Sequence, residues 1–215
     1  MKKSVLEQYR QELHPLHEDF SQKLAQLFGD LMKGSDIPYA LVEHRTKTVE
    51  SFAEKVKRKG YANPFSEMTD LSGIRLITYY HDDVQRVASI IRKEFAVDLA
   101  NSSDKIEELD VDEFGYRSLH FVVRLSECRR ALPEWRKYDR LSAEIQVRSV
   151  LQHAWAAISH KLDYKRSSEA PPELRRSLFR LSALFELADD VFVSIRDRAT
   201  AVPPFSGQFP VRVIA

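Results

Sequence analysis

Hydrophobic and polar positions follow two periods along this chain, and each change of period marks a change of secondary structure. Residues 4–32 repeat apolar side chains at spacings of three, four and seven, which predicts a helical stretch that is divided or reopened at Pro15. The segment YALVEHRT is typical of a strand, and a helix is expected from Thr48 to about Lys59, where Gly60 stops it. The chain is therefore expected to begin with helix, strand and helix.

The middle of the chain alternates between strands and helices. The segments GIRLITYY, YRSLHFVVRL and LSAEIQVRS have the pattern of strands. Residues 82–95 and 149–163 have the pattern of amphipathic helices, and the polar, acidic run 101–114 is expected to be a loop. Strands that alternate with helices favour an α/β or α+β domain, with a central sheet and helices around it.

The most regular pattern follows Pro171 and Pro172. Apolar residues alternate at spacings of four and three over three heptads, namely Leu174, Leu178, Leu181, Phe185, Ala188, Phe192 and Ile195. This stripe predicts a long helix that packs either on the protein's own sheet or against a second copy of the chain. Residues 201–215 contain three prolines and a glycine and are expected to form an extended tail.

Composition narrows the class of protein. The 215 residues suffice for one domain, or for one domain with a helical appendage. The 33 Lys and Arg residues nearly balance the 32 Asp and Glu residues, so any site for a polyanion must come from local clustering. Cys128 is the only cysteine, which excludes an internal disulfide and fits a reducing compartment. No apolar run resembles a signal peptide or a membrane span, so we expect a cytoplasmic protein.

The first candidate site is a basic face on the predicted helix after Thr48. The residues that recur every four positions on this face are Lys47, Ser51, Lys55 and Lys59. Arg45 lies just before the helix entrance, where the helix dipole and free backbone amides also favour phosphate. The face is therefore a candidate phosphate site, although such stripes are also common on solvated surfaces.

A second candidate is the start of the strand GIRLITYY. Asp70 precedes this strand, and Arg75 points to the face opposite Ile74 and Leu76. An arginine inside an apolar strand needs a partner, and a carboxylate, a phosphate or the face of an aromatic base would each serve. An acidic residue before a strand is also common in turns, and that alternative stays open for Asp70.

The strand AEIQVRS has three polar residues on one face, Glu144, Gln146 and Arg148. If the strand is central, Glu144 can bind a metal together with Asp70 or take up a proton, as in phosphoryl-type transfer. An edge strand with a solvated face is the alternative.

Other chemistry is signalled weakly or not at all. Tyr116 follows a glycine in GYRSLH and offers a ring for stacking. His153 and His160 lie seven residues apart with no glutamate between them, so we interpret them as polar contacts and not as a zinc pair. The chain contains none of the patterns GxxxxGKS/T, GxGxxG and GxSxG, which excludes the enzyme classes built on them.

Four stretches in one order carry a family resemblance: HRTKTVESFAEKVKRK at 44–59, DLSGIR at 70–75, GYRSLH at 115–120 and EIQVRSVLQHAWAAISHKLDYK at 144–165. On these motifs the chain resembles the synthetase domain of the RelA/SpoT family, in the short, single-domain form of the small alarmone synthetases. The resemblance implies an α+β, nucleotidyltransferase-like fold, in which a mixed sheet is flanked by helices.

The resemblance also implies how the chain is organised. It implies a single synthetase-type domain over residues 1–200, followed by the extended tail 201–215. The parts of that domain are N-terminal helices at 4–34, a core at 38–165 and a C-terminal helix at 171–199.

The implied reaction is the Mg²⁺-dependent transfer of pyrophosphate from ATP to the ribose 3′-hydroxyl of GDP or GTP, which makes (p)ppGpp and releases AMP. In this resemblance Arg45 and Arg75 sandwich the adenine. The matches to the ATP phosphate contacts are Lys47, Ser51, Lys55 and Lys59. Asp70 and Glu144 match the Mg²⁺ ligands, and Glu144 also matches the activator of the attacking hydroxyl.

On the acceptor side, Tyr116 matches the ring that stacks on guanine. The residues that match acceptor-side or supporting positions are His120, Gln146 and Arg148.

One departure from the family pattern bears on the acceptor. Asp112 and Phe114 stand where alarmone makers of this family usually carry a basic residue and an asparagine. Toxic members of the family pyrophosphorylate the 3′ end of tRNA and need an antitoxin, so tRNA is the alternative acceptor. Candidates for a tRNA-binding patch are Arg129, Arg130, Arg136, Lys137 and Arg140, or Arg175 and Arg176. A nucleotide-binding regulatory module without turnover is the second alternative.

Overall fold

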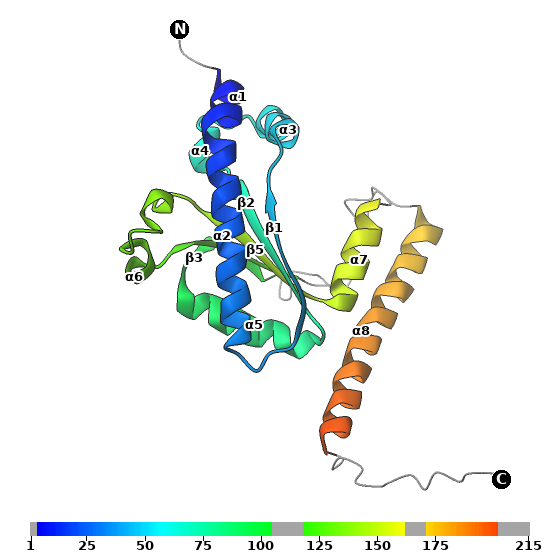
Figure 1. The fold of residues 1–215 in the computed structure, drawn as a ribbon. Coiled ribbons are helices and arrows are strands. Elements are labelled where there is room, and N and C mark those ends of the chain that lie inside the picture. The colour runs from blue at the N-terminus through cyan, green and yellow to red at the C-terminus, as the bar shows by residue number, and fades with distance from the viewer. Residues whose placement is uncertain (1–3, 105–117, 162–170, 202–215) are drawn as a thin grey trace, which may run out of the picture.

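A computed structural model describes residues 4–104, 118–161 and 171–201, and it has a five-stranded mixed sheet at its centre (Figure 1). The strands are β1 (Tyr39–Thr46), β2 (Ser72–Thr78), β3 (Phe95–Asp104), β4 (Leu119–Leu125) and β5 (Ala143–Ser149). Their order across the sheet is β1-β2-β5-β4-β3, with β2 and β5 parallel and every other pair antiparallel. β5 is therefore the central strand, and the predicted α+β fold is confirmed.

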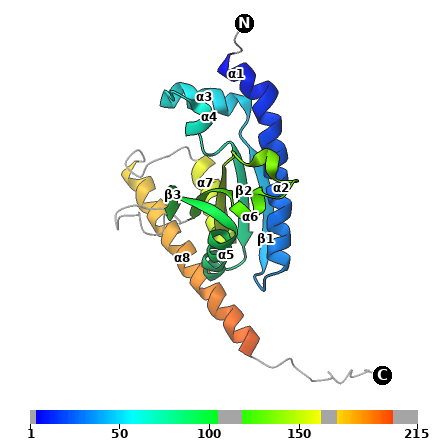
Figure 2. The same cartoon turned by 90° about the vertical axis from the view of Figure 1, so that its left-hand side faces the viewer.

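The helical elements lie before, between and after the strands (Figures 1 and 2). They are α1 (Val5–Gln8), the π-helical segment η1 (Tyr9–Leu13), α2 (His14–Lys33), α3 (Val49–Lys59), α4 (Pro64–Glu67), α5 (His81–Glu94), α6 (Glu127–Arg130), the 3-10 turn η2 (Arg136–Tyr138), α7 (Val150–Lys161) and α8 (Pro172–Ala201). Pro15 occupies the first turn of α2, so it opens the second part of the N-terminal helical stretch. None of the described helices is both long and apolar enough to cross a membrane.

The main hydrophobic core lies between α2, α5 and one face of the sheet. Phe20, Leu24 and Phe28 of α2 pack with Val87 and Ile91 of α5. The alternate residues of the three central strands close this core from the sheet side, namely Ile74, Leu76, Leu119, Phe121, Val123, Ala143, Ile145 and Val147. Because side chains alternate along a strand, the intervening polar residues point to the opposite face, away from this core.

A second, smaller core holds α3 against the N-terminal helices. The rings of Tyr9 and Phe52 stack with their centroids 4.0 Å apart, and Met68 and Leu71 complete the cluster. The phenol of Tyr9 also donates a hydrogen bond to the carbonyl of Lys47 (2.6 Å). Burial, together with the nearby charge of Asp70, raises the pKa of Tyr9, so the phenol keeps its proton and remains a donor. This cluster positions the connection from β1 to α3.

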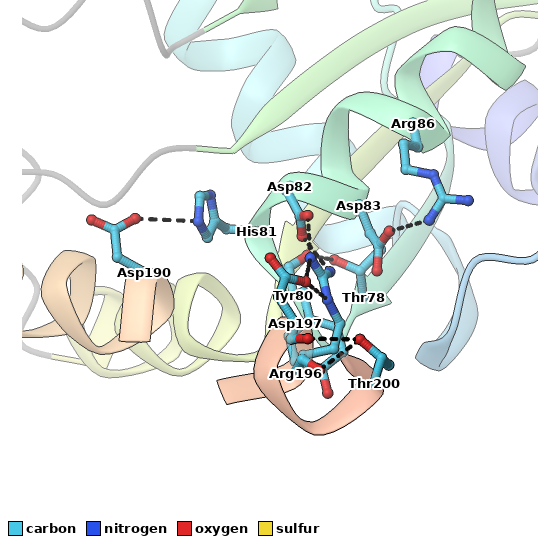
Figure 3. Close-up of polar contacts among 10 residues, drawn as sticks. All are labelled: Thr78, Tyr80, His81, Asp82, Asp83, Arg86, Asp190, Arg196, Asp197 and Thr200. Carbon is cyan, nitrogen blue, oxygen red and sulfur yellow. Dashed lines mark hydrogen bonds and ion pairs between the residues drawn. The ribbon is translucent and has the colours of Figure 1, made fainter. Parts of the chain in front are cut away.

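Helix α8 attaches to the ends of β2 and β5 (Figures 1 and 3). Arg196 donates two hydrogen bonds to the carboxylate of Asp82 (2.9 and 2.8 Å), and its guanidinium lies 4.7 Å from the ring centre of Tyr80. The hydroxyl of Ser149, at the end of β5, donates to Asp189 (2.7 Å). These contacts hold α8 where the two parallel strands end.

The predicted apolar stripe of this long helix is buried only in part. Leu178 is buried and Phe185 packs on Trp155 of α7, which agrees with packing on the protein's own elements. The large apolar side chains that stay exposed are Leu184, Leu187, Val191, Phe192 and Ile195.

The expectation of a loop over residues 101–114 was wrong in its first part. β3 extends to Asp104, and its backbone pairs with β4 up to Asp98 and again from Ser103, with a register shift between. The short elements α4, α6 and η2 carry too little periodicity to be predicted. Residues 105–114 and the tail after residue 201 lie outside the described residues.

Candidate functional site

The polar face of the sheet carries a pocket at the first halves of β2 and β5. Its walls come from β1, β2, β5 and the segments that flank β1 and β2. The lining residues are Glu43, Arg45, Lys47, Asp70, Gly73, Ile74, Arg75, Glu144 and Gln146. Six of them were predicted from the sequence, and they come from segments about one hundred residues apart. The parallel pairing of β2 with β5 brings these segments together, because it places Gly73 opposite Glu144 and Arg75 opposite Gln146.

Asp70 binds two lysines at one side of this pocket. Its Oδ2 lies 2.9 Å from Nζ of Lys47 and 2.8 Å from Nζ of Lys55. Burial alone would raise the pKa of this carboxyl, but the hydrogen bonds from Lys55 and Lys47 outweigh burial and hold the pKa below its usual range. The second oxygen, Oδ1, is buried without a hydrogen bond. The carboxylate thus stays charged and retains one oxygen for a further partner.

Local structure explains why both lysines reach Asp70. Thr48 caps α3 by accepting a hydrogen bond from the amide of Ser51 (3.2 Å), which starts the helix directly after Lys47. Lys55 follows two turns later on the face that turns toward Asp70, the residue two positions before β2. Gly60 ends the helix with a left-handed backbone (φ 64°).

A row of polar side chains crosses the sheet beside the two lysines. Glu43, Arg75, Gln146 and His120 are cross-strand neighbours on β1, β2, β5 and β4. Nη1 of Arg75 donates to Glu43 (2.6 Å), and its Nε donates to Gln146 (3.5 Å). The partner that the sequence required for Arg75 is therefore a carboxylate in this structure. Sequence analysis missed Glu43, although its place two residues before Arg45 on the same strand face was a usable signal.

Glu144 is held at the centre of the site by two neighbours. Its Oε1 lies 2.9 Å from Nδ1 of His120, and its Oε2 accepts a hydrogen bond from Gln146 (3.0 Å). The other ring nitrogen of His120 lies 2.8 Å from the hydroxyl of Ser118. Burial would raise the pKa of Glu144, but the hydrogen bond and the charge of His120 outweigh burial and lower it. The charge of Asp70 acts in the opposite direction, so the two carboxylates lie near enough to interact.

Arg148 extends the positive side of this face beyond the pocket walls. Burial, with the charge of Arg75 as a second cause, lowers the pKa of Arg148 to about 10, and its Nε is buried without a hydrogen bond. Burial and the same two arginines lower the pKa of His153, which is therefore neutral near pH 7. An anion bound here would relieve the repulsion between Arg75 and Arg148.

Two of the predicted residues stand apart from this cluster, and a third cannot be placed. Ser51 lies at the start of α3 and exchanges hydrogen bonds with Thr48 outside the pocket walls. Lys59 is exposed one turn beyond Lys55, about 6 Å farther along the helix. Tyr116, like Asp112 and Phe114, lies outside the described residues.

Comparison with known proteins identifies the family of the chain. The model for a region found in RelA / SpoT proteins matches residues 44–169, which is more than half of the chain. The chain belongs to the RelA/SpoT family, and the predicted resemblance is confirmed.

Several of the relatives that match are small alarmone synthetases or GTP pyrophosphokinases. The chain is 33% identical over 162 residues to the GTP pyrophosphokinase YjbM of Bacillus subtilis. The aligned region covers 74% of this chain and 72% of the relative. It is similar to the crystal structure of small alarmone synthetase 1 from B. subtilis, with a TM-score of 0.69, 26% identity and coverage of 91% and 100% of the two chains. It is also similar to small alarmone synthetase 1 bound to its product pppGpp, with a TM-score of 0.64, 29% identity and coverage of 85% and 93%.

Proposed function

We propose that this protein is a GTP pyrophosphokinase, which transfers pyrophosphate from ATP to the ribose 3′-hydroxyl of GDP or GTP and releases AMP. The observation that carries the proposal is one pocket whose walls include both Asp70, which binds two lysines just before β2, and Glu144 of β5, the strand parallel to β2. The names of the relatives support the same activity, since YjbM is a GTP pyrophosphokinase and small alarmone synthetase 1 binds pppGpp as its product.

ATP would bind on the side of the pocket formed by β1, α3 and the start of β2. Lys47 and Lys55 supply positive charge for its phosphates, and Lys59 and Ser51 extend the same helix face. Arg45 and Arg75 provide two flat guanidinium groups for the adenine ring. Arg75 would exchange its contact with Glu43 for the base, which is feasible because both side chains are partly exposed.

Two carboxylates suit a divalent metal that is held mainly by substrate. Within residues 4–104, 118–161 and 171–201, no group of three or more His, Cys, Asp or Glu residues could hold a metal by itself. Mg²⁺ typically takes one or two protein carboxylates and completes its shell with water and nucleotide phosphates. The unbonded Oδ1 of Asp70 and the nearby Glu144 fit that requirement. When bound, Mg²⁺ neutralises charge on the phosphates.

Glu144 would accept the proton of the attacking 3′-hydroxyl. Its lowered pKa keeps it ionised at pH 7, and the hydrogen bonds of His120 and Gln146 fix its orientation. Arg148 supplies positive charge on the acceptor side. Stacking of guanine on Tyr116 stays a prediction, because that residue lies outside the described part of the chain.

A transfer assay tests the proposal. Purified protein is incubated with ATP labelled at its β and γ phosphates, Mg²⁺, and either GDP, GTP or deacylated tRNA. We expect label to appear in the guanosine nucleotide together with an equal amount of AMP. Label that moves only to tRNA would replace the proposal by its first alternative, the tRNA-modifying toxin. Unchanged ATP with every acceptor would instead favour a silent nucleotide-binding module.

The remaining expectations about partners stay predictions. A homo-oligomer through residues 174–195 is supported by the exposed apolar side chains of α8, Leu184, Leu187 and Val191 among them. An antitoxin partner follows only if tRNA is the acceptor, and the cytoplasmic location stays a prediction as well.

A further inference from the structure

A second pocket opens beyond the end of β4, and arginine dominates its walls. It is formed by the ends of β3 and β4 together with the connection from α6 to β5. Its lining residues are Ala96, Arg124, Leu125, Glu127, Arg130, Asp139 and Arg140. The three arginines face two carboxylates, so the charged walls carry an excess of one positive charge. An excess of positive charge in a pocket favours the binding of anions.

The arginines differ in how far they are already neutralised. Arg130 lies between both acidic residues, 2.9 Å from Glu127 and 3.7 Å from Asp139. Within the described part of the chain, the side chains of Arg124 and Arg140 form no hydrogen bond or ion pair, and both residues are exposed. Arg124 acts only at longer range, where its charge contributes to the lowered pKa of Asp98. Two guanidinium groups are thus available to a ligand.

The register of the sheet places Arg124, which forms one wall of this pocket, diagonally across from Glu144. Val122 of β4 lies opposite Glu144 of β5, and Arg124 is two residues farther along β4. Residues two apart on a strand share a face, so Arg124 and Glu144 lie on the same polar face. Diagonal neighbours of this type are separated by about 7–8 Å, which is within the reach of an arginine side chain. A molecule whose hydroxyl lies at Glu144 can therefore extend a phosphate toward Arg124.

We propose that Arg124 and Arg140, with Arg130 beside them, form a phosphate-binding site for the acceptor whose 3′-hydroxyl lies at Glu144. This inference rests on the proposed function for its choice of ligand. The shared chemistry is a phosphate group, which is either the 5′-diphosphate of a free guanosine nucleotide or the backbone of an RNA chain. The site is separate from the lysines of the ATP side, which belong to α3 and its entrance.

The test compares acceptor binding by the wild type, the double variant Arg124→Gln/Arg140→Gln and the single variant Arg140→Gln. The matched control is Arg180→Gln, which removes an exposed arginine from α8. Fluorescence anisotropy measures the Kd of a fluorescent GDP and of labelled deacylated tRNA, each at two salt concentrations. Binding of a non-hydrolysable ATP analogue checks that the ATP side is intact, and thermal unfolding checks that each variant is folded.

We expect the double variant to weaken at least one acceptor about tenfold or more, since two charge-assisted hydrogen bonds are lost. The single variant should lie between it and the wild type, and the ATP analogue should bind all proteins equally. If only fluorescent GDP is affected, the phosphate belongs to the free nucleotide. If only tRNA is affected, its salt dependence should also become shallower by about one unit per lost phosphate contact, and the backbone of RNA is the ligand.

Three results would overturn the site. They are unchanged Kd values for both acceptors in the double variant, an equal loss in Arg180→Gln, and no binding of either acceptor by the wild type. Failure of the proposed function has a different signature. The arginines would then still determine binding of GDP or tRNA, but the transfer assay would show no labelled product with any acceptor.

Discussion

The two ends of strand β2 lie in different surroundings. Its first residues follow Asp70 and line the polar pocket, and its last residues lie where α8 attaches. Both ends carry clusters of ion pairs, but the clusters are built differently. At the α8 end, Arg196 uses two nitrogens to bind both oxygens of Asp82, and hydrogen bonds from Arg196 lower the pKa of that carboxyl (Figure 3). At the pocket end, Asp70 binds two lysines through a single oxygen and leaves the other without a hydrogen bond.

The difference indicates that the cluster at α8 stabilises the fold and that the cluster around Asp70 can bind a ligand. A bidentate pair uses the hydrogen-bonding capacity of both partners, so it adds geometry and a modest stabilisation. When two lysines share one carboxylate oxygen, their ammonium groups keep unused donors and the other oxygen keeps its acceptor capacity. A buried oxygen without a hydrogen bond lowers stability, and a ligand that binds it can restore that stability. In open α/β sheets, ligands usually bind at the carboxyl ends of the strands. Here α8 covers those ends of β2 and β5, and the pocket lies on the polar face at their beginnings.

The largest effect is expected from Glu144→Gln. If Glu144 accepts the proton, transfer should fall about 10²–10⁴-fold, while the shape of the side chain and its contact with Gln146 are largely kept. Single-turnover experiments measure the rate of transfer, and the Kd of an ATP analogue measures ATP binding separately. Transfer at the wild-type rate would remove Glu144 from the reaction.

A second large effect is expected from Asp70→Asn. Loss of this charge should lower transfer by about 10–100-fold or more. Mutating a residue that only hydrogen-bonds to a metal ligand typically costs that much already. The concentration of Mg²⁺ that gives half-maximal activity should rise. An unchanged metal requirement would indicate that Asp70 serves only to hold Lys47 and Lys55.

The free energy of unfolding should also depend on pH through a residue at the start of β2. There the buried ring of His17 lies 2.8 Å from the hydroxyl of Ser72. Burial, and secondly the charge of His14, lowers the pKa of His17 from 6.5 to about 4 in the folded protein. Between these values the unfolded chain binds more protons, so stability contributed by neutral His17 is present above pH 6.5 and is lost as the pH falls toward 4.

We expect His17 to account for a loss of about 1–2 kcal/mol between pH 7 and pH 5. Urea unfolding at the two pH values measures it, and His17→Asn, which does not titrate in this range, should show a correspondingly smaller change. Equal pH dependence in both proteins would assign the loss to other groups.

The smallest effect is expected from Asp82→Asn at the α8 end. The cluster is partly exposed, so its loss should lower the free energy of unfolding by only about 1 kcal/mol. Transfer activity should stay at the wild-type level, in contrast to Asp70→Asn. A strong loss of activity with intact folding would show that the attachment of α8 controls the pocket and would end the distinction drawn above.

Much of this architecture could be predicted from short stretches of sequence, and the failures have local causes. The capped helix from Thr48 to Gly60 was predicted because capping and stop signals act within a few residues. The second half of β3, Asn101 to Asp104, was predicted to be a loop because Asn and Asp disfavour strands. Pairing with β4 overrides that preference, and the hydroxyl of Ser102 accepts a hydrogen bond from the amide of Val122.

The sequence by itself determined the family, the α+β class and the identity of most charged residues in the pocket, because these follow from motifs and from the period of apolar positions. Only the tertiary structure decided which charges meet. Glu43 with Arg75 and the two lysines on one oxygen of Asp70 both depend on strand order and register, as does the placement of Arg124 on the same face as Glu144. Register is set by the packing of one face of the whole sheet, and no single segment contains that information.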